Sequence, residues 1–392
     1  MYERALVGKL AERLSEPRHF IQIVTGPRQT GKSTAVSQAL EKTDIPRAEF
    51  SFDRPRDRRS RKLEEVWHSA RTLAQERGEA VLSLDEMQKV PDWSGTVKYL
   101  WDEDARLGVN LKVVVTGSST LMLRKGMADS LKGRFELSQS TQWTYAECKE
   151  AFGCSLEEYL YFGGYPGAVQ LRSDEGRWLA YMRDSIIEPT LSQDVLEMET
   201  VRKPALLRAL FEVGAAYSAQ EVSYRKLLGQ LDDRGNTDTI AHYLGLLDQA
   251  GLMTGLRKYD EKVLRERASS PRLLVHDTSL MVASSGERRA RLLEDRERRG
   301  HLVETAVGAY LLARASSEGF SVNWWRDGAA EVDFVVTQGR RRTAIEVKSG
   351  RIKGTRGLGE FVRRFPGTYA LVVGSDEFPV EDFLLGRIPV FQ

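Results

Sequence analysis

Short apolar runs alternate with longer amphipathic segments in the first third of the chain. Residues 20–25, 80–84 and 111–115 are rich in aliphatic and β-branched side chains over the length of a buried strand. Residues 33–41 have the pattern of a helix that begins soon after the first run. Because buried strands that alternate with helices are typical of parallel sheets, this pattern predicts an α/β domain.

The middle of the chain has a helical pattern instead. Residues 178–201 are predicted to form a helical connector, and the strand-like stretch 252–259 comes later. Between them, residues 236–239 (N-T-D-T) offer a helix cap. Three short helices followed by a hairpin predict a winged helix-turn-helix. The three helices are expected at residues 205–213, 224–231 and 239–250.

Two functions stay open for this middle part. A winged helix would contact DNA through the start of its third helix and through its wing. The third helix has few basic residues, however, so a small interaction or spacer domain is the alternative. The residues expected at the helix start and on the wing are Thr237, Asp238, Thr239, His242, Arg257 and Lys258.

The C-terminal part predicts a helix followed by a small sheet. Residues 301–315 are amphipathic and carry Glu304 on an otherwise apolar stretch. Strands are expected at residues 322–325, 331–336 and 343–349, with a short glycine-containing turn before the last one.

The hairpin formed by the last two strands brings three charged residues together. A turn centred between Gly339 and Arg340 places Asp333 opposite Glu346, and Lys348 on the same face as Glu346. Two facing carboxylates repel unless a cation joins them, and Mg²⁺ prefers oxygen ligands. The pattern therefore predicts a metal site, with a cross-strand set of salt bridges as the alternative.

The length of the chain indicates several domains. A chain of 392 residues exceeds one ordinary domain. The changes of pattern predict an α/β core at 1–150, a helical lid or connector at 151–203, a winged-helix-like domain at 204–290 and a further α/β domain at 291–392.

Charge and composition exclude some classes of protein. The 58 basic and 56 acidic residues give a net charge of +2, which predicts no strong sequence-independent attraction to nucleic acid. Residues 54–62 and 287–299 are locally basic, as solvated faces often are. Cys148 and Cys154 are too few for a disulfide framework. The sequence shows no signal peptide and no apolar run of the roughly 18 residues that a membrane span needs. We therefore expect a cytoplasmic protein without membrane contact.

The first strand runs directly into a phosphate-binding motif. The stretch G-P-R-Q-T-G-K-S-T begins at Gly26 and satisfies G-x-x-x-x-G-K-[ST]. Its glycines allow the backbone to curl so that N–H groups point at phosphate oxygens, and the following helix adds its positive end. Lys32 would contact the β and γ phosphates, and the Ser33 hydroxyl would contact Mg²⁺.

The second strand ends in two adjacent acids, as in a Walker B motif. Asp85 at the strand tip can hold the hydrated magnesium ion, and Glu86 can polarise the attacking water as a general base. The third strand ends in T-G-S-S, where Thr116 or Ser118 would sense the γ-phosphate or position water, unless the stretch is a plain turn.

Arg134, in S-L-K-G-R-F, is a candidate arginine finger for the transition state, and Arg124 is a weaker one. Arg134 would act in trans only in a homo-oligomer, and an ordinary surface salt bridge is the alternative. The expected catalytic residues are thus Glu86, Lys32 and Arg134, and the expected metal ligands are Ser33 and Asp85. The residues expected to bind ATP are Gly26, Pro27, Arg28, Gln29, Thr30, Gly31, Lys32, Ser33, Thr34, Asp85 and Ser118.

Together these motifs resemble a group of prokaryotic AAA+ ATPases. The resemblance rests on G-P-R-Q-T-G-K-S-T, L-D-E-M-Q-K-V-P-D-W, V-V-V-T-G-S-S and L-K-G-R-F, and on Y-L-Y-F-G-G-Y-P-G-A at 159–168. In that group the ATPase core is followed by a domain of unknown function. The group has a proline before an aromatic-x-Glu sequence that this chain lacks within 138–147. The resemblance implies ATP and Mg²⁺ binding but no defined biological task.

The C-terminal constellation resembles the PD-(D/E)XK nuclease superfamily, so residues 291–392 are expected to be restriction-endonuclease-like. The resemblance implies that Asp333 and Glu346 bind metal, that Lys348 is the catalytic lysine and that Glu304 is an accessory acid. The family's proline before the aspartate is absent here, where Glu331 and Val332 precede Asp333.

Two functional hypotheses follow from the sequence. In the first, the protein hydrolyses ATP to ADP and phosphate and couples its nucleotide state to DNA binding or processing. In the second, it is a nucleotide-switched module that binds a protein partner and carries an inactive nuclease fold.

Overall fold

The computed structural model describes residues 2–117, 130–195, 201–230, 236–260, 270–350 and 355–392. The chain forms two compact units, Met1–Thr141 and Gln142–Gln392. The first unit therefore ends before the domain boundary predicted at residue 150. The reason is that helix α6 (Tyr145–Phe152) packs within the second unit, where the Tyr145 hydroxyl donates to Glu381 Oε1 at 2.9 Å.

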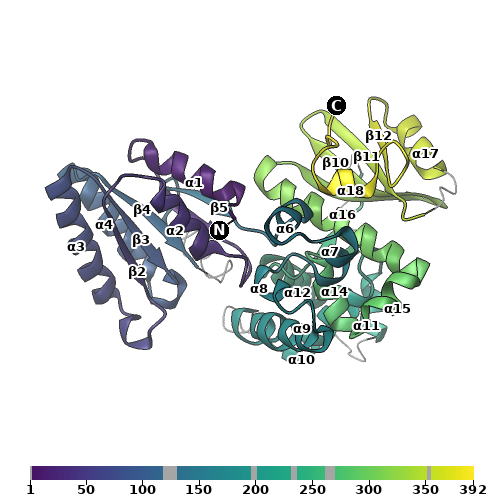
Figure 1. Cartoon of the computed structure of the whole chain (residues 1–392), viewed down its shortest axis with the longest axis horizontal. Coiled ribbons are helices and arrows are strands. Elements are labelled where there is room, and N and C mark those ends of the chain that lie inside the picture. Colours follow the sequence, from purple (N-terminus) through teal and green to yellow (C-terminus); the bar gives the residue numbers. More distant parts are fainter. Residues whose placement is uncertain (1, 118–129, 196–200, 231–235, 261–269, 351–354) are drawn as a thin grey trace. The chain divides into compact units, whose positions relative to one another are not determined.

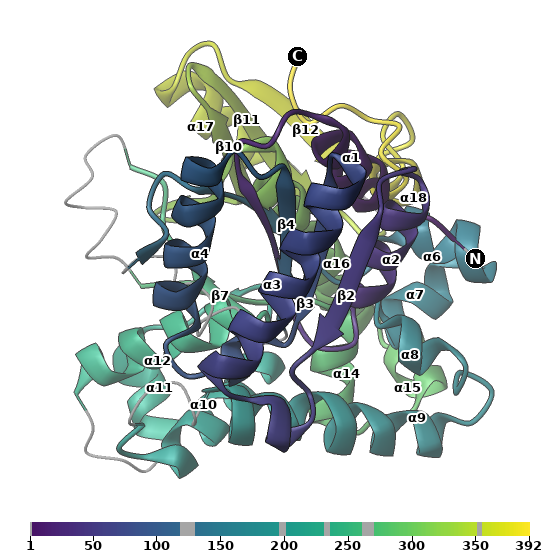
Figure 2. The ribbon, with the colours of Figure 1, turned by 90° about the vertical axis from the view of Figure 1, so that its left-hand side faces the viewer.

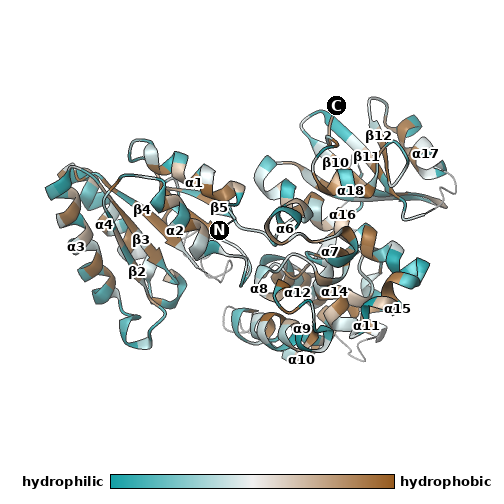
Figure 3. Ribbon diagram, in the orientation of Figure 1, coloured by the Kyte–Doolittle hydropathy of each residue, from teal (hydrophilic) through white to brown (hydrophobic). Residues whose placement is uncertain are grey.

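The first unit is built on a five-stranded parallel sheet with the strand order β2-β3-β4-β1-β5. The central strands β1, β3 and β4 are almost completely buried, as their apolar sequences predict, and Figure 3 shows β3 and β4 largely in the hydrophobic colour. The strands are β1 (Ile21–Thr25), β2 (Arg47–Ser51), β3 (Ala80–Asp85), β4 (Leu111–Thr116) and β5 (Phe135–Gln139).

Helices cover both faces of this sheet (Figure 1, Figure 2). Helices α1 (Ala5–Ser15) and α2 (Lys32–Glu41) pack on one face, and α3 (Ser60–Arg77) and α4 (Trp93–Leu107) on the other. Two short turns, η1 (Pro55–Asp57) and η2 (Met87–Lys89), follow β2 and β3. All strands are parallel, so their carboxyl ends meet at one edge of the sheet, where a ligand of such a fold binds.

The edge strands β2 and β5 are absent from the sequence prediction. Both have alternating or mostly exposed positions rather than an apolar run, because a strand at the edge of a sheet is covered less than a central one. The three strands and the helix that were predicted in this unit are confirmed.

The second unit begins with helices that lead to a three-stranded sheet, β6-β8-β7. The Asn236 side chain accepts from Asp238 N and caps α12, as predicted. The first elements are α7 (Leu156–Phe162), α8 (Pro166–Val169), α9 (Glu175–Tyr181) and the π-helical turns η3 (Met182–Ile187) and η4 (Thr190–Val195). The next are α10 (Pro204–Ala216), β6 (Gln220–Glu221), α11 (Tyr224–Gln230), α12 (Thr237–Gln249), β7 (Met253–Leu256), β8 (Arg272–Val275), α14 (Thr278–Ser285) and α15 (Arg289–Glu294).

The long helix α16 (Arg296–Glu318) precedes a four-stranded sheet with the order β12-β11-β10-β9. The pairs of β10 with β11 run from Phe334–Ile345 to Gln338–Arg341, which confirms the register predicted from the turn at Gly339. A bulge between Val332 and Val335 interrupts the pairing of β10 with β9. The remaining elements are β9 (Ser321–Asp327), β10 (Ala330–Gln338), β11 (Arg341–Val347), α17 (Arg356–Arg364), β12 (Tyr369–Val373) and α18 (Val380–Leu384).

The glycine pair in the Y-F-G-G-Y-P-G stretch allows a close crossing inside the second unit. A Cβ on Gly164 would lie 2.0 Å from the carbonyl oxygen of Trp143, and a Cβ on Gly163 would lie 1.9 Å from Asp277 Oδ1. Asp277 is fully buried and accepts from Gly164 N at 2.7 Å, and burial raises its pKa to about 6. The absence of a side chain at these two glycines therefore allows the close packing of segments within this unit.

Within the part of the chain that the structure describes, no helix combines the length and apolarity that a membrane crossing requires.

Candidate functional site

The loop between β1 and α2 is shaped for close backbone contacts. Gly26 has a φ of 149°, and a Cβ at this position would lie 2.0 Å from the carbonyl oxygen of Ser140. Gln29 and Gly31 also have positive φ values, of 59° and 83°. The loop thus curls at the carboxyl edge of the sheet, as the phosphate-binding motif predicts.

Replacing Gly26 with Ala should destabilise the first unit and weaken ATP binding by at least about tenfold, because the new methyl group meets backbone rather than a movable side chain. Thermal unfolding and titration with a fluorescent ATP analogue measure the two effects. Gly8→Ala on α1, where no atom of the described residues lies within 4 Å of the added Cβ, is the control. Equal behaviour of the two variants would contradict the close approach.

Two cationic side chains hold this loop. Lys32 is buried, and its Nζ donates to the carbonyl oxygens of Gly26 (3.0 Å) and Pro27 (2.7 Å). From before α1, Arg4 donates to the carbonyl oxygen of Thr30 at 3.3 Å and to Ser140 Oγ at 3.0 Å. The sequence analysis missed Arg4, because no motif connects it to a loop so distant in the sequence.

The predicted magnesium ligands come together. Ser33 Oγ, in the first turn of α2, lies 3.4 Å from Asp85 Oδ1 at the end of β3. Thr116, at the end of β4, donates its hydroxyl to the same oxygen of Asp85. Three neighbouring elements thus place hydroxyl and carboxylate oxygens at one point, which is the chemistry that a hard divalent cation prefers.

Glu86 follows Asp85 in a left-handed conformation, with a φ of 57°. Its Oε2 accepts from Gln88 Nε2 at 3.0 Å and lies 2.7 Å from Lys89 Nζ. A residue other than glycine in this region carries backbone strain, and such strain often occurs at functional positions.

Arg134 is not brought to the loop. It lies immediately before β5, where its carbonyl accepts from Ile21 N at the amino end of β1, and its guanidinium pairs with both oxygens of Asp102 at 2.8 and 3.0 Å. The P-loop follows the other end of β1, so the structure does not bring Arg134 to the loop of its own chain, and its catalytic role, including a role in trans, stays a prediction. Ser118 and Arg124 lie outside the described residues.

The other predicted contacts stay predictions, although their positions are known. Pro27, Arg28, Gln29 and Thr30 lie in the loop, and Thr34 lies in the first turn of α2. Thr30 Oγ1 donates to the carbonyl of Pro27 at 3.0 Å, so this side chain stabilises the loop itself.

The second predicted site contains an arginine that the sequence analysis missed. Arg272 of β8 is only 4% exposed, and its guanidinium lies between carboxylates of α16 and β10. It pairs with Glu304, with Glu331 Oε1 at 3.1 Å and with Asp333 Oδ1 at 3.4 Å. Burial opposes the charge of Arg272, but the surrounding carboxylates raise its pKa above the ordinary value.

The acids predicted for this site, Glu304, Asp333 and Glu346, form an acidic cluster in which two of them pair with Arg272 and the third pairs with Lys348. Burial and the negative charge of Asp333 raise the pKa of Glu304 well above its ordinary value, and Arg272 opposes this shift. Asp333 Oδ2 also accepts from Val347 N at 2.8 Å. Glu346 instead pairs through Oε1 with Lys348 Nζ at 2.6 Å, while its buried Oε2 has no hydrogen-bond partner among the described residues.

This geometry does not fit a preformed metal site. Among the described residues, no group of three or more histidines, cysteines and acids is arranged to hold a metal ion. Arg272 and Lys348 already provide the positive charges that the sequence analysis assigned to Mg²⁺. The ion pairs of the alternative are present and are partly buried rather than solvated, and the metal site stays a prediction.

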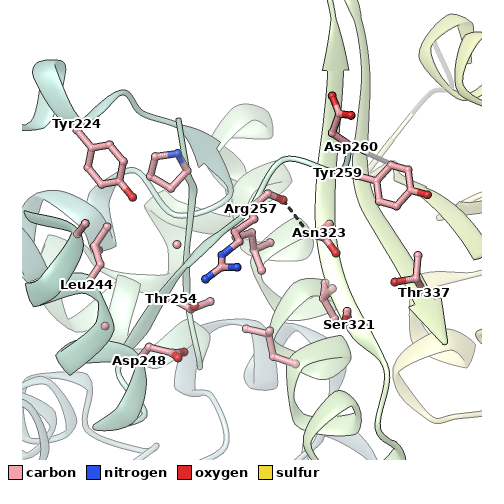
Figure 4. Close-up of a pocket in the computed structure, with 17 residues that line it drawn as sticks. Tyr224, Leu244, Asp248, Thr254, Arg257, Tyr259, Asp260, Ser321, Asn323 and Thr337 are labelled. Atoms are coloured by element: carbon pink, nitrogen blue, oxygen red, sulfur yellow. Dashed lines mark hydrogen bonds between the residues drawn. The ribbon is translucent and has the colours of Figure 1, made fainter. Parts of the chain in front are cut away.

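A cavity of about 820 Å³ lies between α11, α12 and β7 on one side and β9 on the other (Figure 4). Arg257, predicted to lie on a wing, lines this cavity, and its carbonyl accepts from Asn323 Nδ2 at 3.3 Å. Lys258 forms a parallel bridge with Trp324 of β9. The backbone of the predicted wing is thus joined to the C-terminal sheet.

The predicted DNA-contacting start of α12 reaches solvent. Asp238 and His242 are exposed, and Thr237 and Thr239 are partly exposed. These side chains are therefore accessible, and their role stays a prediction.

Comparison with protein families divides the chain in three. Residues 18–151 match the family described as "AAA domain". This segment, most of which lies in the first unit, is an AAA domain. Residues 154–291 match a domain of unknown function, DUF8612, and residues 299–390 match another, DUF4143. The AAA domain and the C-terminal domain of unknown function confirm that part of the resemblance drawn from the motifs.

Two relatives extend over most of the chain. An uncharacterized protein of Haemophilus influenzae is 22% identical over 349 residues, which cover 84% of this chain and 82% of the relative. The uncharacterized protein MJ1544 of Methanocaldococcus jannaschii is 24% identical over 349 residues, or 83% of this chain and 74% of the relative.

Among solved structures, the Walker-type ATPase paby2304 of Pyrococcus abyssi is similar, with 14% identity and a TM-score of 0.48 over 73% of this chain and 96% of that one. RuvB of Thermotoga maritima has 15% identity and a TM-score of 0.33 over 64% of this chain and 86% of that one.

Proposed function

We propose that the protein binds ATP with Mg²⁺ at the loop of residues 26–33 and hydrolyses it to ADP and phosphate. The observation that carries this proposal is the convergence of Ser33, Asp85 and Thr116 beside the curled loop at one edge of a parallel sheet. The AAA domain family of residues 18–151 supports it.

Each residue has a distinct role in this proposal. The backbone N–H groups of the loop and the ammonium group of Lys32 bind the phosphates. Ser33 and Asp85 would hold the magnesium ion, which neutralises charge on the phosphate oxygens. Glu86 accepts a proton from the attacking water.

The Lys32→Met variant tests nucleotide binding. Loss of the ammonium group should weaken ATP binding by about a hundredfold or more, because a charged hydrogen-bond partner of the phosphates is removed. Isothermal titration with ATP and Mg²⁺ measures the affinity, and Lys42→Met, which removes an exposed partner of Glu3, is the control. ATP binding of equal strength in both variants would overturn the proposed site.

We further propose that the nucleotide state is coupled to DNA binding through a winged-helix-like domain. The order of three helices, α10, α11 and α12, followed by β7 and β8, supports this assignment. The accessible start of α12 supports it as well. Double-stranded and single-stranded DNA, tested at low salt, should bind and change ATP turnover. DNA that does neither would exclude the coupling.

A second candidate function is a nucleotide-switched module for a protein partner, with a nuclease-like but inactive C-terminal domain. Arg272 favours inactivity there, because its guanidinium neutralises the carboxylates that would otherwise bind metal. Supercoiled plasmid incubated with the protein and Mg²⁺ should stay intact. Nicking that disappears in Asp333→Asn would instead establish an active nuclease.

A further inference from the structure

Two edge strands of the second unit come together and then part. β7 is the last strand of the three-stranded sheet, and β9 is the last strand of the four-stranded sheet. Just after β7, Trp324 N donates to the carbonyl oxygen of Arg257 at 3.1 Å, and Tyr259 N donates to the carbonyl oxygen of Trp324 at 2.6 Å. These two bonds begin a parallel ladder between the two sheet edges.

The ladder stops after these two bonds. In a parallel ladder, the next bonds would join Val322 N to the carbonyl oxygen of Gly255, and Arg257 N to the carbonyl oxygen of Val322. Neither bond forms between these described residues. Backbone groups of residues two apart on a strand point to the same side, so these N–H and C=O groups face the space between β7 and β9.

The cavity of about 820 Å³ occupies this space, and both Gly255 and Val322 line it (Figure 4). Its volume lies within the range of roughly 300–1,000 Å³ that is usual for ligand sites. Both residues are partly buried. A backbone N–H or C=O group that loses contact with water requires another polar partner, so a ligand of this cavity must offer both donors and acceptors.

A cation also extends into the cavity. Figure 4 shows the side chain of Arg257 between β7 and β9, and among the described residues no carboxylate pairs with its guanidinium. Burial raises the pKa of the Tyr224 hydroxyl, and the charge of Arg257 opposes this shift, so the cation lies close to that ring. Asp248, also in the lining, lies with its Oδ1 3.2 Å from His276 Nε2.

We propose that this cavity binds a short extended segment of a partner protein, which forms backbone hydrogen bonds with the open edges at Val322 and Gly255 and places a carboxylate beside Arg257. The site belongs to the second unit alone, and it does not depend on ATP binding or hydrolysis.

An extended peptide fits these edges better than a nucleic acid does. Its N–H and C=O groups alternate with the spacing of a strand, so one backbone supplies both kinds of partner. The backbone of DNA offers phosphate acceptors without donors, and it would leave the carbonyl oxygens of Gly255 and Val322 unmatched. Asp248 and Asp260 in the lining would also repel phosphates.

Selection from a displayed library of random peptides of about ten residues, the length of a long strand, tests the site on the full chain. A recovered peptide is labelled with fluorescein, and its affinity is measured by fluorescence polarisation. Ala241→Trp, at an exposed lining position of α12, fills the cavity and should weaken binding by at least about tenfold. Ala216→Trp, at the exposed end of α10 and outside the lining, is the matched control.

The charge is tested with Arg257→Gln. The recovered peptides should be enriched in Asp or Glu, and this variant should bind them at least about tenfold more weakly, the effect of one charged hydrogen bond. Arg225→Gln on α11, an exposed arginine outside the lining, should bind as wild type does. Equal affinity of the two variants would remove the carboxylate from the proposal.

Backbone pairing has its own readout. Hydrogen–deuterium exchange resolved to single residues should slow at the amides of Arg257 and Val322 when the peptide binds, because both N–H groups then donate to its carbonyl oxygens. Unchanged exchange at both amides would show binding by side chains alone and would overturn the proposed mode.

The site itself is overturned if the selection returns no peptide, or if wild type and a folded Ala241→Trp protein bind the peptide equally. Thermal unfolding establishes folding, and Ser321→Trp, at the exposed start of β9, fills the same cavity if the first variant fails to fold. A single-stranded oligonucleotide that binds wild type but not the filled variant would assign the cavity to nucleic acid instead. Peptide binding by a protein that hydrolyses no ATP would contradict the ATPase proposal only.

Discussion

Replacing Arg272 with Met should lower the free energy of unfolding of the second unit by about 3–5 kcal/mol. The guanidinium is 4% exposed and is the shared cationic partner of Glu304 and Asp333. Without it, two partly buried carboxylates, 16% and 17% exposed, lie close together with no compensating cation, and their mutual repulsion and desolvation lower the free energy of unfolding. Guanidinium chloride unfolding followed by circular dichroism measures the change.

Two comparisons separate this effect from ordinary loss of an ion pair. Arg208→Met breaks a pair with Glu188 in which both side chains are 44% exposed, so it should cost at most about 1 kcal/mol. Combining Arg272→Met with Glu304→Leu removes one uncompensated acid and should recover part of the stability. A single Arg272→Met variant as stable as Arg208→Met would show that the cluster does not need its cation.

Glu86→Gln should reduce ATP turnover by about 10²–10⁴-fold, the usual contribution of a general base. The amide is nearly the same size as the carboxylate but cannot accept the proton of water. ATP affinity should change little, because the phosphates are expected to bind Lys32 and the loop rather than Glu86. Turnover is measured by phosphate release, and affinity by titration with ATP and Mg²⁺.

Glu79→Gln is the matched control for this variant. Glu79 lies at the opposite end of β3 and also pairs with a lysine, Lys112, at 3.0 Å. Its replacement should leave turnover unchanged. If Glu86→Gln were equally active, another group would have to activate the water, and the assignment of the base would be wrong.

The sequence determined those parts of the structure that depend on neighbours along the chain. The phosphate loop could be predicted because its glycines, lysine and serine act within a few residues of one another. The pairing of β10 with β11 could be predicted because a short turn fixes the register of its strands. The cap at Asn236 is local in the same way.

Strand order and charge compensation were decided only by the tertiary structure. The sequence of β5 does not indicate that it pairs with β1, or that Arg134 therefore faces Asp102 at the far edge of the sheet. Nor does the sequence indicate that Lys89 contacts Asp53.

The acidic cluster shows the difference most clearly. The sequence correctly predicted the β10–β11 register, which places Asp333 and Glu346 on facing strands, and it offered Lys348 as a partner of Glu346, but it did not indicate the cation beside Asp333. The cation next to Asp333 comes from β8, far earlier in the chain, and only folding brings it there. A carboxylate in a protein interior requires a partner, but the sequence does not state whether that partner is a metal ion or a distant arginine.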